Sequence, residues 1–549
     1  MANNLPRTKS KEPQYKDSTM PSFLISCYLI LMFSFFPLFL TEQFGRARTD
    51  KYTLFLILSG VMIVGVVISS VLAYREERRV HKCTMKFMPL TAPDIAFLCF
   101  YGFAAISTLV SDYTKEAFFG TFTDNMGFNV GGRNNGLLLL TVYLLVYLAI
   151  TRRYSFKDYV IAVYLIFSSF VALLAVLNYF YIDLLGIYDG YYDLWDLFSG
   201  IQNKPSVLLD FGSTLGNKNL ISSFMCLFLP VAVMSFVLIN KRYMRIISGV
   251  AICFAYAGLL CSDSSSGMLG LIAGIAIMAI FCARRYDSFK WYMLALAILF
   301  LSGKLLRLFS YLRGDKSKGF EFIQNFLLYS KKMYLPIILF AVIFVLMLVF
   351  EKKLEPHYPK KTILGVLIAL TAGVVIAGIY AVIHFTVIAP EAELSENLSR
   401  LLRFDEHWGT HRGYYWIKSL DEYKSFSFIH KLFGTGPDTV YAVMEPYFGE
   451  MLELFDEGST DCVHNEFLNY FITQGILGLI SYLAIIGTVT VRALRRTKEN
   501  PMMLIFLSAV ICYAAQSVVN IYQPITTPLF FIFLSMTEAM NRQITLKKA

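Results

Sequence analysis

His464 lies where a long polar segment runs back into an apolar one, and its side chain is suited to proton transfer. The chain reads His464-Asn465-Glu466-Phe467 and continues as a mainly apolar stretch to about residue 491. An imidazole ordinarily titrates near neutral pH, so it accepts a proton without carrying a permanent charge. At the edge of a membrane it would meet both lipid-borne and aqueous substrates. A helix cap or an interfacial histidine would occupy the same position, so both interpretations stay open.

Further candidate residues lie in the polar segment 390–464 that precedes His464. Arg412 is placed near the start of a stretch with helical spacing that includes Trp416. A guanidinium presents a planar fork of donors that matches the oxygens of a phosphate. We therefore assign Arg412 to the reaction centre and take Trp416, Arg403 and Asn465 as candidate substrate contacts.

Two earlier segments place polar residues directly before an apolar stretch. One contains Arg133 within Gly131 to Gly136, and the other contains Asn217, Lys218 and Asn219. Because helix N-termini add N–H donors, these four residues are candidate contacts for a phosphate group. Snorkelling would equally explain Arg133, and helix capping would explain the asparagines. Tyrosine and aspartate gather at 188–196, which suits sugar rings or an interfacial aromatic belt.

The composition indicates that the segments positioning these residues lie in a lipid membrane. The chain has 549 residues, of which 56% are hydrophobic, and its mean hydropathy is +0.56. A soluble core of this length could not hide so much apolar surface. The net charge of +10 follows from basic membrane-flanking loops, so it does not indicate a nucleic-acid partner.

The apolar runs predict an all-α polytopic membrane protein with about 14 transmembrane helices. Segments able to cross about 30 Å of hydrocarbon lie near 22–42, 52–74, 92–111, 136–151, 156–180, 219–239, 243–261, 265–283, 290–303, 335–350, 362–389, 466–491, 501–519 and 525–540. A basic segment at 304–333 is expected to lie on the surface, in contact with anionic membrane lipid or an anionic glycan, or as a solvated face.

Short basic loops alternate along the chain and set its orientation. They lie at 75–86, 152–157, 241–245, 284–290, 352–361 and 492–498, which places them and both termini in the cytoplasm. The predicted organisation is a cytoplasmic N-terminal tail (1–21), transmembrane helices 1–11 (22–389), a large extracytoplasmic loop folded as short helices (390–464), transmembrane helices 12–14 (465–540) and a cytoplasmic C-terminal tail (541–549).

The motifs together resemble the O-antigen ligase and O-antigen polymerase superfamily of bacterial membrane glycosyltransferases. The resemblance rests on the pair Arg412 and Trp416, the turn Leu432 to Pro437, and the run from His464 to Gln474-Gly475. Gly132 to Gly136 and Gly216 to Asn219 are similar to earlier motifs of that family. The similarity covers roughly 130–490, and the first three helices match only in hydropathy.

The resemblance implies transfer of a glycan from an undecaprenyl diphosphate carrier to a glycan, lipid or protein acceptor. The reaction would take place at the outward face of the bacterial cytoplasmic (inner) membrane, without metal or other cofactor and with inversion. His464 would act as general base or diphosphate contact, and Arg412 and Arg133 would hold the diphosphate. Fixed guanidinium groups suit this role because charge develops on the leaving group in the transition state.

The chain departs from the family pattern after the seventh predicted helix. Family members often open the next helix with a serine and an arginine, whereas this chain has Ser262 to Gly267 with Asp263 and no arginine. Lys218, Arg400 or Arg403 would have to supply that cation. Asp263 would either cap the helix or accept a hydrogen bond from a sugar hydroxyl, and capping is the favoured interpretation.

Two other function classes fit a polytopic chain. A lipid-linked oligosaccharide flippase or polysaccharide transporter would place polar groups at the bilayer midplane and often shows two similar halves. A scaffold would bind envelope polymer without converting it. The predicted helices are nearly free of charge and the ionisable residues gather outside them, which favours an enzyme. Polymerase is favoured over ligase, although both share this chemistry.

Overall fold

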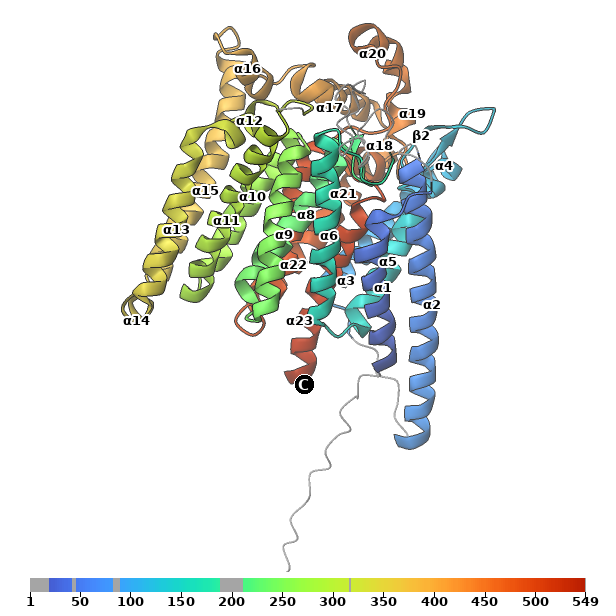
Figure 1. Ribbon diagram of the computed structural model, residues 1–549. Coiled ribbons are helices and arrows are strands. Elements are labelled where there is room, and N and C mark those ends of the chain that lie inside the picture. The colour runs from blue at the N-terminus through green and yellow to red at the C-terminus, as the bar shows by residue number, and fades with distance from the viewer. Residues whose placement is uncertain (1–18, 42–45, 82–88, 188–210, 315–316, 549) are drawn as a thin grey trace, which may run out of the picture.

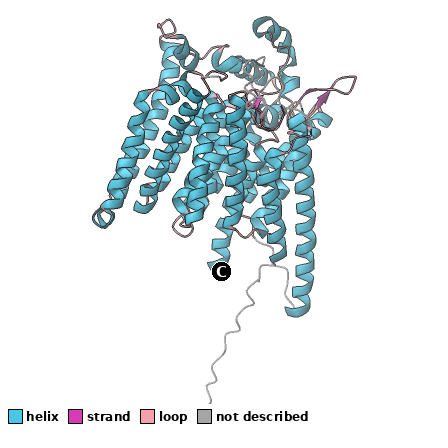
Figure 2. Ribbon diagram, viewed as in Figure 1, coloured by secondary structure: helices cyan, strands magenta, loops and turns pink. Residues whose placement is uncertain are grey.

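The computed structural model describes residues 19–41, 46–81, 89–187, 211–314 and 317–548. Long helices form a bundle whose one end is covered by short helices (Figures 1 and 2). We call this the loop end and the opposite end, where the C-terminus lies, the basal end. The tyrosines and aspartates at 188–196 lie outside the described residues.

The long helices follow the apolar runs of the sequence, because a helix satisfies its own backbone polar groups in hydrocarbon. They are α1 (Thr19–Leu38), α2 (Ala47–His81), α3 (Ala92–Val110), α5 (Leu137–Arg153), α6 (Asp158–Tyr179), α8 (Lys218–Leu238), α9 (Arg242–Cys261), α10 (Ser265–Cys282), α11 (Tyr286–Leu312), α13 (Tyr334–Val349), α15 (Lys360–Ile383), α21 (Glu466–Arg496), α22 (Met503–Gln516) and α23 (Thr527–Lys548).

Short elements connect the long helices. At the loop end they are α4 (Thr114–Phe119), α12 (Phe322–Tyr329), α16 (Glu396–Leu402), α17 (Trp408–Ser425), α18 (Phe428–Phe433), α19 (Val440–Met444) and α20 (Phe448–Phe455), and at the basal end α14 (Glu351–Leu354). Strands β1 (Phe122–Thr123) and β2 (Asn129–Gly131) pair antiparallel, as do β3 (Phe211–Gly212) and β4 (Gly216–Asn217). The segment 390–464 thus folds as short helices.

Eleven helices in the described part of the chain are long and apolar enough to cross a membrane. The other three expected spans coincide with α5, α22 and α23, which are shorter or carry more polar residues, so the count of 14 stays a prediction. The expected surface helix at 304–333 is largely wrong: α11 continues to Leu312, and only α12 lies across the surface.

Helix α8 forms the centre of the bundle. Its spanning window is entirely buried, whereas none of the window of α15 is, so α15 lies at the periphery, where lipid would cover an apolar helix. Aromatic rings fill the core beside α8, as where Tyr164 of α6 meets Phe228 of α8 edge to face with ring centroids 5.9 Å apart. The helices therefore act as a rigid support for the loop end.

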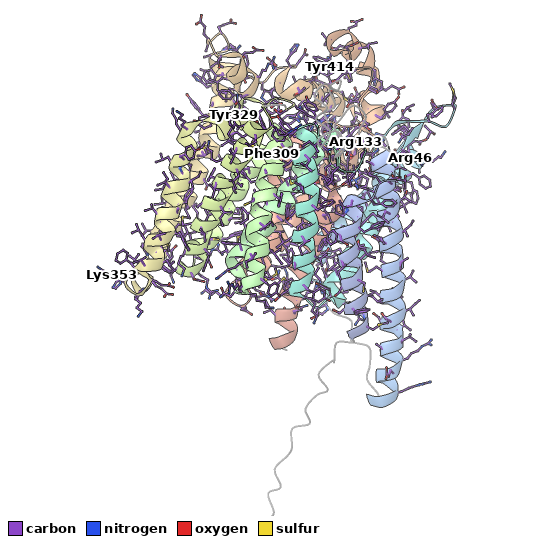
Figure 3. All side chains as sticks on the ribbon, in the orientation of Figure 1. Arg46, Arg133, Phe309, Tyr329, Lys353 and Tyr414 are labelled. Carbon is purple, nitrogen blue, oxygen red and sulfur yellow. The ribbon has the colours of Figure 1, made fainter. Side chains whose placement is uncertain are left out.

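Labelled side chains mark the two ends of the bundle. Arg133 and Tyr414 lie at the loop end, as does Arg46, and Lys353 lies at the basal end (Figure 3). Arg133 comes from the segment before α5 and Tyr414 from α17, so segments far apart in the sequence meet at one end of the bundle.

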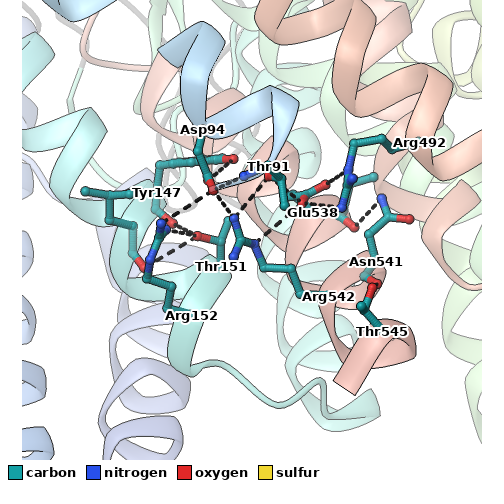
Figure 4. Close-up of polar contacts among 12 residues, drawn as sticks. Thr91, Asp94, Tyr147, Thr151, Arg152, Arg492, Glu538, Asn541, Arg542 and Thr545 are labelled. Carbon is teal, nitrogen blue, oxygen red and sulfur yellow. Dashed lines mark hydrogen bonds and ion pairs between the residues drawn. The ribbon is translucent and has the colours of Figure 1, made fainter. Parts of the chain in front are cut away.

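A buried ion network joins the ends of four helices on the basal side (Figure 4). Asp94 of α3 is fully buried and pairs with Arg542 and, at 3.4 Å, with Arg152. Glu538, also fully buried, accepts hydrogen bonds from Arg492 at 3.0 and 3.1 Å. Because each buried carboxylate has guanidinium partners, the network ties α3, α5, α21 and α23 together.

We expect Asp94→Ala to lower the free energy of unfolding by about 3–5 kcal/mol, because it removes the buried carboxylate that pairs with Arg152 and leaves Arg542 with Glu538 alone. Denaturant unfolding of the purified protein would measure the change. Asp158→Ala is the matched control, since Asp158 pairs with Lys241 at the surface and its loss should leave the midpoint nearly unchanged. Equal stability of both variants would contradict this role for the network.

Candidate active site

A break in α21 holds the turn at 434–439 against the bundle. Gly475 has a left-handed φ of 68°, and a Cβ there would lie 2.2 Å from the carbonyl oxygen of Leu432. Gly434 also has a positive φ, and a Cβ on it would lie 2.2 Å from the backbone of Thr473. Gly436 donates its N–H to the Thr473 carbonyl at 2.9 Å. Only glycine permits so close an approach of two backbones.

Asp438, at the end of this turn, holds the segment that carries Arg133. Its buried carboxylate accepts the backbone N–H groups of Arg133 at 2.6 Å and Asn135 at 2.8 Å. Burial raises the pKa of Asp438 to about 7, although these two hydrogen bonds act in the opposite direction. The turn and the segment before α5 are thereby fixed to each other.

Arg133 is partly paired by Asp461. Its Nε donates to Oδ1 of Asp461 at 2.7 Å, and its Nη2 lies 2.7 Å from the same oxygen. Burial opposes the charge of Arg133, but Asp461 outweighs it and raises the guanidinium pKa. Nη1 of Arg133 is buried and has no hydrogen-bond partner among the described residues. Arg133 therefore keeps donors available for an anion.

Arg412 is a buried cation without a counter-ion. The regular part of α17 begins at Arg412, after Gly409 to His411 with left-handed backbone angles, as the helical spacing predicts. The residue is 9% exposed, and its side chain makes no hydrogen bond or ion pair within the described part of the chain. Burial lowers its pKa, while Cys462 and Glu321 act weakly the other way. A buried charge left unpaired favours binding of an anion.

The positive charges of Arg412 and Arg133 both act on His464. Its ring stacks on Tyr415 with centroids 5.7 Å apart, and its Nδ1 is buried without a partner among the described residues. Burial, followed by the charges of Arg412 and Arg133, lowers its pKa to about 3, and Asp461 only partly opposes them. The free site thus differs from the expected titration near neutrality, because both cations disfavour the imidazolium.

A narrow pocket brings Arg133 and His464 together, and Arg412 is not among its lining residues. It is lined by Arg133, Asp438, Cys462, His464, Asn465, Glu466, Asn469, Asn520, Ile521 and Tyr522. Asn465 caps α21 by accepting the N–H of Leu468 at 3.0 Å. Within the described residues, no group of three or more His, Cys, Asp or Glu side chains is placed to hold a metal ion. The pocket offers one guanidinium, amides and an imidazole beside the carboxylates of Asp438 and Glu466. Arg133, with Arg412 nearby, is the part of it that suits a phosphate group next to a proton acceptor.

The sequence analysis did not anticipate the contribution of Asn520, Ile521 and Tyr522. They lie between α22 and α23, in a connection flanked by apolar residues and without a charged group. The alternation of basic loops already placed this connection on the same side as His464, and that was the one signal available. Asn520 donates to the carbonyl of Asn219 at 3.0 Å.

Asn217, Lys218 and Asn219 adjoin the pocket through Asn520. Asn217 caps α8 by accepting the N–H of Asn219 at 2.8 Å, and Lys218 lies 3.7 Å from Glu321. Asp263 accepts the N–H of Glu321 at 3.0 Å and does not cap α10, so the favoured capping role was wrong. Amides and a lysine thus border the pocket on the side of α8.

Trp416 and Arg403 support the short helices around the pocket. Trp416 donates its indole N–H to the carbonyl of Val463 at 2.9 Å, next to His464. Arg403 donates to the carbonyl of Ala392 at 2.9 Å and does not line the pocket. The structure therefore brings Arg133, Arg412, Asn465 and His464 together and places Arg403 in the packing of α16.

Comparison with known proteins concerns the second half of the chain. A family model described as O-Antigen ligase matches residues 322–483, which run from the start of α12 into α21. The match includes Arg412, the turn at 434–439 and His464. A comparison with curated proteins gives no match. Residues 322–483 are thus similar to the O-antigen ligase family, and the apolar helices around them are those of a multi-pass membrane protein.

Proposed function

We propose that this enzyme transfers a glycan from undecaprenyl diphosphate to an acceptor hydroxyl at the outward face of the bacterial cytoplasmic membrane. The observation that carries the proposal is the pair of buried guanidinium groups that act on His464. Among the described residues, Arg412 has no ion-pair partner and Nη1 of Arg133 has no hydrogen-bond partner. The family match supports a glycan-ligating reaction. In this proposal 390–464 is the extracytoplasmic part of the site.

The arginines would bind the diphosphate and stabilise it as a leaving group. The bond between the anomeric carbon and the phosphate oxygen breaks, and the diphosphate leaves with the electron pair. Negative charge grows on that oxygen in the transition state, where guanidinium groups already held in place stabilise it without reorganisation. Asp461 orients Arg133 through hydrogen bonds of 2.7 Å. No metal is needed to neutralise the charge when two guanidinium groups supply it.

His464 would accept the proton of the attacking hydroxyl. The hydroxyl oxygen bonds to the anomeric carbon from the side opposite the diphosphate, which inverts the configuration, and its proton passes to the imidazole. In the free site burial, followed by the charges of both arginines, lowers the pKa of His464 to about 3. A bound diphosphate would compensate the two positive charges, so the pKa of His464 should rise toward its ordinary value of about 6.5. The base therefore becomes competent when the donor is bound.

The distribution of charge supports an enzyme over a flippase. The unpaired cations lie at the loop end, and the buried ion network lies at the basal end, where its carboxylates have guanidinium partners. A transport path would place ionisable groups near the midplane of the bundle. Polymerase and ligase would use the same pocket and differ in the acceptor, and we favour polymerase.

We expect His464→Ala and Arg412→Ala each to lower transfer by about 100-fold to 1,000-fold, the effect of removing one transition-state donor or base. Purified protein with undecaprenyl-diphosphate-linked oligosaccharide and EDTA would be assayed by product size. Lengthened carrier-linked products indicate a polymerase, and products on an added acceptor indicate a ligase. Lys424→Ala, on an exposed residue of α17 that pairs with Asp421, is the control and should keep full activity. Transport of the glycan across liposomes without transfer would overturn the enzyme assignment.

We expect the ring of His464 not to titrate between pH 5 and 8 in the free protein, because its pKa lies near 3. On addition of undecaprenyl diphosphate it should begin to titrate in that range. Histidine NMR of the purified protein would show the change, with His464→Gln to assign the signal. Arg412→Gln should raise the pKa of the free ring, since it removes one nearby positive charge. A ring that titrates near pH 6.5 without ligand would contradict the geometry.

A further inference from the structure

A second pocket lies at the loop end, outside the reaction centre. It is lined by Asp112, Tyr113, Glu422, Ser425, Phe426, Ser427, His430, Thr435, Thr439, Ala442, Val443 and Pro446. These residues come from the end of α3, the end of α17, α18 and α19. The cavity measures about 290 Å³, close to the lower size of small-ligand sites. We call it the acidic pocket.

The acidic pocket and the reaction centre share one wall. Thr435 and Thr439 of the turn line the acidic pocket, while Asp438 of the same turn lines the reaction centre. The hydroxyls of Thr435 and Thr439 lie 2.8 Å apart, and Ser111 of α3 donates to the Thr435 carbonyl at 2.5 Å. The wall is therefore rigid, and a ligand in the acidic pocket lies next to the reaction centre without entering it.

The two pockets differ in whether a cation accompanies their carboxylates. The reaction centre has Arg133 beside Asp438 and Glu466, with Arg412 nearby, whereas the acidic pocket has Asp112 and Glu422 and no arginine or lysine in its lining. The imidazole of His430 is engaged at 3.2 Å by the carbonyl of Val110. Carboxylates at the pocket wall disfavour a phosphate or a diphosphate. A ligand of the acidic pocket is therefore uncharged or cationic.

The lining has the groups that recognise an uncharged polyol. Glu422 accepts from Tyr447 at 3.1 Å and from Ser425 at 3.2 Å, so its carboxylate is oriented and keeps acceptor capacity, since each oxygen has two lone pairs. Tyr113 is 39% exposed, so part of its ring is open to a ligand. Carboxylates accept from sugar hydroxyls, and ring faces cover the C–H surface of a sugar.

We infer that the acidic pocket is a glycan subsite that binds uncharged sugar units of the acceptor or product chain, away from the bond being formed. The identity of the ligand rests on the proposed function, because a glycan is the polyol that a glycosyltransferase would hold next to its diphosphate site. The subsite holds part of the glycan beside the reaction centre, so it governs glycan affinity and leaves the chemical step to the arginines and His464.

The test is direct binding of glycan without transfer. The probe is the envelope glycan of the producing bacterium, freed from its carrier by mild acid and titrated into the purified full-length protein by calorimetry. Ala442→Phe fills the pocket, and the double variant Asp112→Asn with Glu422→Gln removes its charge. Each should weaken glycan binding by about tenfold or more, the effect of losing one or two hydrogen bonds to charged groups.

Controls separate this inference from the proposed function. Asp421→Asn changes an exposed carboxylate next to Glu422 that pairs with Lys424, and it should bind glycan as the parent protein does. Binding of undecaprenyl diphosphate without sugar should be unchanged in Ala442→Phe, which also shows that the variant is folded. Absence of transfer with pocket-dependent glycan binding would overturn the proposed function and leave the subsite standing.

Two results would overturn the subsite. The first is glycan binding that Ala442→Phe and the charge variants leave unchanged. The second is a pocket that binds a lysine-rich peptide in a manner dependent on Asp112 and Glu422 while binding no glycan, since the ligand would then be a cation recognised by charge.

Discussion

The approach of the turn at 434–439 to the broken helix α21 is the contact on which the rest of the loop end depends. Gly434 and Gly475 allow two backbones to touch where any side chain would collide. That contact sets the position of Asp438, which in turn holds the segment of Arg133 by two backbone hydrogen bonds. The same turn walls off the acidic pocket. One backbone contact therefore positions a cation of the reaction centre and separates this pocket from one that has no arginine or lysine in its lining.

Buried charged residues differ in their partners at the two ends of the bundle. At the basal end Asp94 and Glu538 are fully buried and have guanidinium partners, so their charges serve packing. At the loop end Arg412 is buried and Arg133 keeps a buried donor, and the part of the chain that the structure describes supplies neither with a partner. Unpaired buried charge is costly in free energy, and it persists where a ligand supplies the missing partner. This difference supports locating function at the loop end.

Part of the site could be predicted from the sequence. The predicted residues are those whose position follows from their near neighbours along the chain. Arg412 and His464 were found because each opens a helix that its own apolar spacing reveals. Asn520 and Tyr522 were missed, since their connection between α22 and α23 has no charged or unusual residue. Asp461 and Asp438 were missed because an acidic residue in a polar loop carries no signal of its partner. Arg403 was included for its charge alone, and its partner is a backbone carbonyl of Ala392.

The sequence by itself determined that the protein lies in a membrane, where its apolar helices run, and which residues are able to bind phosphate or transfer a proton. It could do so because hydropathy and side-chain chemistry are local properties. Only the tertiary structure decided which of these residues meet. The pairing of Arg133 with Asp461, the lack of a partner for Arg412 and the low pKa of His464 arise from segments hundreds of residues apart brought to one end of the bundle. Desolvation and Coulomb interactions depend on distance in space, and no local pattern encodes that distance.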